Sequence, residues 1–145
     1  MEKDFDRWND VKKNVHREPD IIGLHQRELW LIAFGLNVGV EIDGKHTSFE
    51  RPGIVLRKFN NQMTWVLPVT SQEKDSPFYE RFTFNDQAYY VALTQLRTVS
   101  TKRYLRKIGM IPMADFERMQ QKVSRFALLN ERSPAQGGAP RRPKP

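Results

Sequence analysis

The chain contains no cysteine and no long apolar run, and these two absences restrict what it can be. Without cysteine it has no thiolate nucleophile, no cysteine-based zinc site and no disulfide framework, which fits a reducing compartment. The longest apolar run, residues 29–34, is far too short to span a bilayer, and the first residues are charged instead of forming a signal-peptide pattern. We therefore expect a soluble, cytoplasmic protein without a membrane partner.

Acidic residues are outnumbered, with 17 Asp and Glu against 24 Lys and Arg, so the formal net charge is +7 at pH 7. An excess of Lys and Arg drives association with polyanions because these side chains displace counterions from phosphates. Arg141, Arg142 and Lys144 lie in a tail that need not touch a partner, but the rest of the chain is basic without them. Nucleic acid is the partner class that this charge favours.

The length of 145 residues suits one folded domain, and the 39% apolar content is enough for a single core. We expect a helical extension over residues 1–26, the domain over 27–129, and a disordered basic tail rich in Pro and Gly over 130–145. Within the extension, apolar side chains spaced by three and four residues predict a helix over 3–17. These side chains are Phe5, Trp8, Val11 and Val15.

The middle of the chain alternates short apolar runs with turn signals, which is typical of an antiparallel meander. We place strands at residues 27–35, 53–59, 63–69, 78–84 and 87–96. The second and third are joined by Asn60-Asn61-Gln62, whose Asn pair favours a hairpin. The fold class expected is α+β and mainly β, an SH3-like small β-barrel between an N-terminal helix and a C-terminal amphipathic helix.

After the meander, Ser100 and Thr101 are expected to cap a turn that runs through Arg106, and residues 108–112 to return as a short strand. Apolar residues at helical spacing then predict an amphipathic helix over 113–129. This helix is expected to pack on the core or to contact a partner.

Arg51 stands directly before Pro52, and the residue before a proline is restricted to extended backbone. Its guanidinium is permanently charged and forked, which suits bidentate binding of a phosphate. Thr70 follows the second hairpin strand, so antiparallel pairing brings its hydroxyl to the same end of the sheet. The sequence therefore predicts a site at which a guanidinium and a hydroxyl converge.

Five segments in a fixed order resemble the MazF/PemK family of toxins from type II toxin-antitoxin systems. They are RELWLIAFGLNVGVEIDGK, RPGIVLRKF, WVLPVTS, LTQLRTVSTKRYLRKIG and ADFERMQQKV. The likeness spans about residues 27–129, and the longer members of the family also begin with a helix that bears Phe and Trp. No single segment is diagnostic, and their order and spacing carry the resemblance.

This resemblance implies a homodimeric barrel that cleaves single-stranded RNA, usually at a short preferred sequence and without a metal ion or other cofactor. The ribose 2′-hydroxyl would attack the phosphorus, giving a 2′,3′-cyclic phosphate and a 5′-hydroxyl end, so DNA would be spared. It also implies a cognate antitoxin, whose disordered and often acidic segment would occupy the RNA groove.

The resemblance also implies roles for individual residues. Arg51 matches the catalytic arginine of the family's Arg-Pro motif and would stabilise the phosphorane, while Thr70 matches the residue that closes the Pro-x-Thr motif and would bind the phosphate. Glu41 is the candidate general base because the family often has a carboxylate in this loop. His46 is its rival because histidine titrates near neutral pH. His46 could equally be an exposed spectator, and Glu41 a partner of Lys45.

RNA contact is expected from basic and aromatic residues near this site. Arg97 matches an arginine that some relatives use in the active site or in RNA contact, although an exposed residue at a strand end would look the same. Some relatives carry an acidic residue shortly after it, where this chain has Val99 and Ser100. A mechanism that relies on an aspartate there therefore does not carry over.

The other candidates for contact with the RNA backbone are Lys45, Arg57, Lys58 and Lys102. Phe59, Phe49 or Trp65 could stack on bases, or could belong to the core. For Trp65, in the middle of a strand, we expect a core position. The glycine-containing loop over residues 39–50 is interpreted as a mobile lid above a groove, with Arg51 as the fixed point at its base.

Two alternatives to a nuclease remain open. A CcdB-like toxin shares the fold but poisons a protein target without cutting RNA, and an SH3-like module could bind RNA without catalysis. The pairing of Arg51 with Thr70 favours the nuclease, because a surface that only binds protein has no need of that pair.

Overall fold

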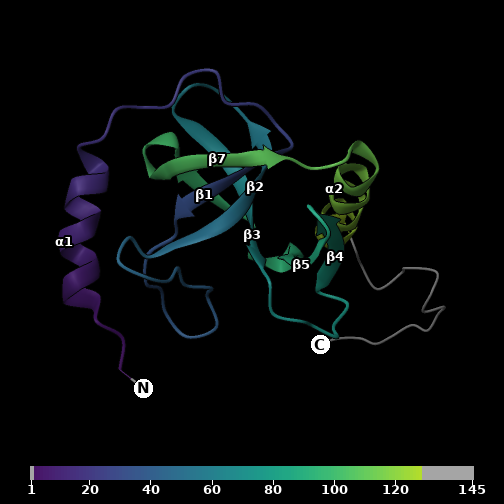
Figure 1. The fold of residues 1–145 in the computed structure, drawn as a ribbon, viewed down its shortest axis with the longest axis horizontal. Helices are drawn as coiled ribbons and strands as arrows, with labels where there is room; N and C mark the ends of the chain where they lie inside the picture. Colours follow the sequence, from purple (N-terminus) through teal and green to yellow (C-terminus); the bar gives the residue numbers. More distant parts are fainter. Residues whose placement is uncertain (1, 129–145) are drawn as a thin grey trace, which may run out of the picture.

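The computed structural model describes residues 2–128 as two helices around a seven-stranded sheet. Figure 1 shows α1 and α2 on opposite sides of the strands. The α-helices are α1 (Phe5–His16) and α2 (Met113–Leu128), and the 3-10 turns are η1 (Leu93–Gln95) and η2 (Thr101–Arg103). The strands are β1 (Glu28–Ala33), β2 (Glu50–Lys58), β3 (Met63–Thr70), β4 (Tyr79–Phe84), β5 (Gln87–Ala92), β6 (Arg97–Ser100) and β7 (Tyr104–Met110).

All strand pairs among the described residues are antiparallel, in the order β4-β5-β3-β2-β1-β7. The strand β3 belongs to two parts of the sheet, because its first four residues pair with β6 and its last two, Val69 and Thr70, pair with β5. Pro68, which has no N–H to donate, lies between the residues of β3 that pair with β6 and those that pair with β5. No hydrogen bonds join β6 to β7 within residues 2–128, so the curled sheet is not closed.

Apolar side chains on the two faces of the sheet form two buried clusters. Successive residues of β2 serve both, since Ile54 belongs to the cluster under α2 and Val55 to the cluster on the other face. From α2, Phe116 and Met119 are buried in the first cluster. The carboxylate of Glu80 on β4 binds two cations of this helix, Arg118 and Lys122, and fastens it further.

The helix α1 is capped by Asp4, whose side chain accepts a hydrogen bond from the Arg7 N–H at 3.0 Å. It docks through Trp8, which is only 6% exposed and packs edge to face on Phe49 at 5.5 Å. Gly35 makes this possible: its φ is +81°, and an added Cβ would lie 2.3 Å from the Trp8 ring.

Most predicted elements are confirmed, including the first helix, the β2–β3 hairpin and the last helix up to residue 128. The predicted end of that helix at residue 129 and the tail over 130–145 lie outside the described residues. The strand predicted over 87–96 was too long. It ends at Ala92 because η1 intervenes, and the separate strand β6 was missed because no Gly or Pro marks the break.

The turn after Ser100 is shorter than predicted. The Ser100 side chain does accept from the Lys102 N–H at 3.1 Å, but η2 ends at Arg103 and β7 begins at once, because Tyr104 already pairs with β1. The core position expected for Trp65 was wrong. Its neighbours Thr64 and Val66 point inward, so strand alternation leaves Trp65 39% exposed, edge to face with Phe59.

No helix within residues 2–128 is long and apolar enough to cross a membrane.

Candidate functional site

Arg51 lies near the start of β2, and its guanidinium is held by main-chain carbonyls. Its Nε donates to the Asp43 carbonyl at 2.6 Å and one amino group donates to the Val69 carbonyl at 3.4 Å. Burial lowers the pKa of Arg51, while the neighbouring Asp43 and Tyr79 side chains favour its charged form. The cation is therefore oriented without a carboxylate hydrogen-bonded to it in the described part of the chain.

Thr70 lies beside this guanidinium at the end of β3. Continuing the register two residues past the Gly53–Pro68 pair brings Arg51 opposite Thr70, next to the carbonyl of Val69 that Arg51 binds. The Thr70 hydroxyl accepts from the Gln72 N–H at 3.1 Å, and within residues 2–128 it donates no hydrogen bond. The structure thus brings the two residues together as the hairpin predicted, and leaves a hydroxyl proton available.

Asp43 is a residue that the sequence analysis did not single out. Its carbonyl holds Arg51, while its carboxylate accepts from the Asn37 N–H at 2.6 Å and forms an ion pair with Lys3 at 2.9 Å. Lys3 also donates to the Asn37 carbonyl. The segment before α1 is therefore tied to the loop that positions Arg51. No sequence signal for this was available, because the link joins residues 40 positions apart.

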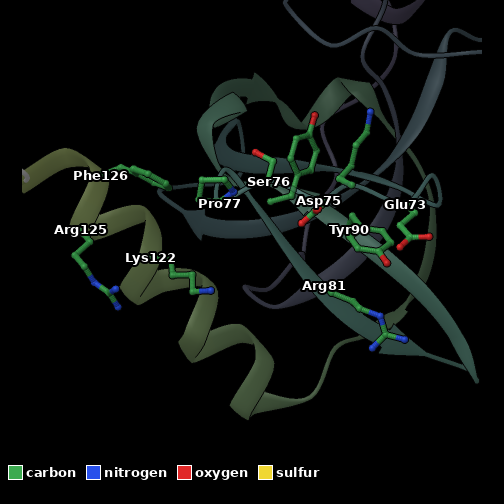
Figure 2. A pocket seen from close by; sticks show the side chains of 11 residues that line it. Glu73, Asp75, Ser76, Pro77, Arg81, Tyr90, Lys122, Arg125 and Phe126 are labelled. Carbon is green, nitrogen blue, oxygen red and sulfur yellow. The ribbon is translucent and has the colours of Figure 1, made fainter.

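A cavity of about 820 Å³ lies between α2, the segment before β4, and the strands β4 and β5, and neither Arg51 nor Thr70 is among the residues that line it. Two tyrosines of its wall connect it to the site, since Tyr79 lies near Arg51 and Tyr90 pairs with Thr70. Figure 2 shows Tyr90 and Arg81 on the strand side of this cavity and Lys122 on α2. Lys74, Arg81, Lys122 and Arg125 contribute positive charge, against Glu73 and Asp75. Aromatic and basic side chains together suit single-stranded nucleic acid.

Glu41 and Arg97 line a second, smaller cavity of about 390 Å³. Burial lowers the pKa of Arg97, and Glu41 partly offsets this because it lies close enough to favour the cation. One oxygen of the Glu41 carboxylate accepts from the Val38 N–H at 3.0 Å. Arg97 itself donates to the Phe34 carbonyl at 3.2 Å, with its guanidinium 5.7 Å from the Phe34 ring centre.

His46 and Lys45 lie at the exposed part of the loop over residues 39–50. The backbone of His46 is left-handed at φ +64°, and Lys45 forms a bridge with Glu50 through main-chain hydrogen bonds only. No side-chain hydrogen bond or ion pair of His46 is found in the described residues. The two candidate bases thus lie on separate parts of the loop, and within residues 2–128 neither forms a hydrogen bond or ion pair with Arg51.

The loop over residues 39–50 is fastened along its length. Gln95 holds it from the side, accepting from the Ile42 N–H at 3.1 Å and donating to the Val40 carbonyl at 3.1 Å. The Gly44 N–H donates to the Gly35 carbonyl at 2.8 Å. Its mobility as a lid stays a prediction, although the side chain of Val40 in this loop is largely exposed.

The other predicted RNA-binding residues lie at the end of the β2–β3 hairpin, on η2 and, for Phe49, in the core. Phe59 is exposed at the end of the hairpin, with the Arg57 guanidinium 5.2 Å from its ring centre and Lys58 next in sequence. Lys102 lies on η2, where it donates to the Glu18 carbonyl at 2.7 Å. Phe49 is buried against Trp8 and is a core residue.

Residues 2–128 contain no group of three or more His, Asp or Glu side chains placed to hold a metal ion.

The sequence matches a protein-family model over most of its length. A family model described as "PemK-like, MazF-like toxin of type II toxin-antitoxin system" matches residues 25–127, which is 103 of the 145 residues. No curated protein matches the sequence. The match begins after α1, so this helix lies outside the part that the family model describes.

Solved structures of similar fold include the following three. MazF (Form-I) from Deinococcus radiodurans has a TM-score of 0.62 at 20% identity, covering 77% of this chain and 98% of that chain. An endoribonuclease in complex with its cognate antitoxin from Mycobacterial species has a TM-score of 0.55 at 10% identity, covering 74% and 98%. Mycobacterium tuberculosis toxin MazF-mt6 has a TM-score of 0.53 at 13% identity, covering 72% and 99%. At these identities the likeness concerns the fold, and it confirms the predicted fold class.

Proposed function

The chain belongs to the PemK-like, MazF-like toxins of type II toxin-antitoxin systems, and from this premise we propose that it is an endoribonuclease that cleaves single-stranded RNA without a metal ion. The observation that carries the proposal is the fixed guanidinium of Arg51 beside the Thr70 hydroxyl, which donates no hydrogen bond within residues 2–128. Both groups donate hydrogen bonds, as the oxygens of a phosphorane require.

In this proposal the ribose 2′-oxygen attacks the adjacent phosphorus and loses its proton to a general base. The extra negative charge that develops on the phosphorane oxygens is stabilised by Arg51 and Thr70. The bond from phosphorus to the 5′-oxygen then breaks, and that oxygen takes up a proton. The products are a 2′,3′-cyclic phosphate and a 5′-hydroxyl end.

Arg51 acts as a fixed cation. Two of its donors are used by the carbonyls of Asp43 and Val69, and its second amino group donates to no residue within the described part of the chain. That amino group can bind a phosphate oxygen without any loss of the existing contacts. Proton transfer by Arg51 is disfavoured because a guanidinium is hard to deprotonate.

The general base is Glu41 or His46 in this proposal. One oxygen of Glu41 is used by the loop backbone, and the carboxylate lies close to the cation of Arg97. His46 has an exposed side chain at the loop surface. Either would have to approach the ribose through movement of the loop or through the RNA bending toward it.

The cavity lined by Tyr79 and Tyr90 would hold nucleotides next to the cleaved bond. Tyr79 and Tyr90 offer faces for stacking, and Lys74 and Arg81 offer charge for the backbone. Lys45, Arg57, Lys58, Phe59, Arg97 and Lys102 remain the further candidates for RNA contact. A cognate antitoxin with an acidic segment would compete for the same surface, and a homodimer is expected from the family.

The test is incubation of the purified chain with mixed-sequence single-stranded RNA in EDTA, followed by mapping of the cut positions and the end groups. We expect cuts at a recurrent short sequence, with cyclic phosphate ends, that disappear in Arg51→Ala and Thr70→Ala. Intact RNA with folded, antitoxin-free protein would instead favour a toxin that binds a protein target. RNA that is bound but never cut would favour an RNA-binding module.

A further inference from the structure

A further pocket, lined mainly by basic residues, lies away from the Arg51 site, between α1 and η2. Its volume is about 510 Å³, and six of the eight lining residues are basic: Lys12, Lys13, His16, Arg17, Lys102 and Arg103. No Asp or Glu is among the residues that line it. In Figure 1, α1 stands beside the turn that leads into β7, which is η2.

Two cations that line this pocket, Arg103 and Lys102, are only partly neutralised within residues 2–128. Arg103 donates to the Ala33 carbonyl at 2.8 Å and lies 5.8 Å from the centre of the Trp8 ring, with no ion pair among residues 2–128. Burial lowers its pKa to about 10, and the like charge of Arg97 contributes. Lys102 has a carboxylate at 4.0 Å, that of Asp20. An anion in the pocket would therefore offset charge that the protein leaves uncompensated.

The pocket is preformed because α1 is held at several points. Trp8 packs on Gly35 and Phe49, and the segment before the helix is tied to the loop by the ion pair between Lys3 and Asp43. Lys12 and Lys13 lie on the exposed part of α1. Since α1 lies outside the matched residues 25–127, the pocket combines an added helix with the family domain.

We propose that this α1–η2 pocket binds phosphate groups of single-stranded RNA outside the cleavage site, so that α1 extends the RNA-binding surface. The inference rests on the proposed function in taking RNA as the substrate. Val15 is the one apolar residue of the lining. A bound protein segment needs apolar contacts at the centre of its interface, whereas a nucleic-acid backbone is held mainly by charge, so the lining favours RNA.

The test measures binding of the full chain to single-stranded 2′-O-methyl RNA, which has no free 2′-hydroxyl and is not cut, over a series of salt concentrations. An oligonucleotide of about 20 nucleotides exceeds the ~4–16 that a small single-strand-binding domain covers. We expect Lys12→Gln and Lys13→Gln each to weaken binding several-fold. The slope of log K against log salt is negative, and each substitution should make it shallower by about 0.7, the value for one phosphate contact on a single strand.

The matched control is Arg106→Gln, which removes one positive charge from an exposed position of β7 outside the pocket. It should leave the slope at the wild-type value. Equal slopes for wild type, Lys12→Gln and Lys13→Gln would overturn the inference. Binding of a polyglutamate peptide is measured with the same proteins. If Lys12→Gln and Lys13→Gln lose binding to this peptide while their RNA binding is unchanged, the inference is also overturned and the pocket is assigned to an acidic protein.

Cleavage of ordinary RNA by the same preparations separates this inference from the proposed function. If the wild type cuts RNA and the pocket variants bind it normally, the α1–η2 site is wrong and the nuclease stands. If the pocket variants lose RNA binding but the wild type never cuts, the site stands and the nuclease is wrong.

Discussion

Replacing Trp8 by alanine should release α1 from the rest of the molecule. The ring is almost fully buried, lies on Gly35, contacts Phe49 and is covered by the guanidinium of Arg103. A tryptophan buries about 200 Å², so at about 25 cal/mol per Å² the burial is worth at most ~5 kcal/mol. Measured Trp→Ala changes in cores cost about 3–5 kcal/mol.

We expect a smaller global effect, because α1 has only 12 residues and is marginal as an isolated helix. Once undocked it should unfold locally while the sheet persists. Native-state hydrogen exchange of the α1 amides should therefore report a loss of about 3 kcal/mol in their opening free energy. The amides of β2 and β3 should change much less.

The matched control is Phe5→Ala in the same helix, since Phe5 is 47% exposed. Phe5→Ala should lower the opening free energy of the α1 amides by less than about 1 kcal/mol. Unchanged protection of the α1 amides in Trp8→Ala, or an equal loss of protection in the sheet amides, would show that Trp8 does not hold α1 as a separately opening unit.

Two further predictions concern buried polar groups. Burial alone would raise the pKa of Glu28, but hydrogen bonds from Trp30, from the His25 N–H and from Lys107 lower it. Its contribution to stability is therefore full above the ordinary carboxyl pKa and is lost as pH falls through the lower folded value, so Glu28→Gln should cost about 2 kcal/mol at pH 7. In urea titrations at several pH values, the difference in unfolding free energy between Glu28→Gln and wild type should shrink as the pH is lowered. Thr64→Val should cost about 1–3 kcal/mol in the same assay, because it leaves the buried hydroxyl of Tyr104, 2.7 Å away, without its partner.

The sequence predicted the parts of the site that depend on local pairing. A hairpin fixes which residues face each other, so Arg51 and Thr70 could be brought together from spacing alone. The contributions of Asp43 and Tyr90 could not, because they depend on how a long loop folds back and on which strand pairs with the end of β3.

The helix α1 and the strand residue Trp65 illustrate the same limit. Apolar spacing predicted α1 and placed Trp8 among its apolar side chains, but the partner of Trp8 is a glycine 27 residues away whose role is only to leave space. The position of Trp65 was mispredicted because strand composition does not say which face is covered. Strand alternation turned it outward beside Phe59.

The most direct test of the central claim is the single-turnover cleavage rate of a defined single-stranded RNA in EDTA by wild type, Arg51→Lys and the control Arg106→Lys. Lysine keeps the charge of Arg51 but not the fork that binds two carbonyls and, in the proposed function, a phosphate as well. We expect Arg51→Lys to lower the rate by about 10²–10³-fold, as for loss of an oxyanion donor, with the control unchanged. A folded Arg51→Lys protein that cleaves at the wild-type rate would contradict the account.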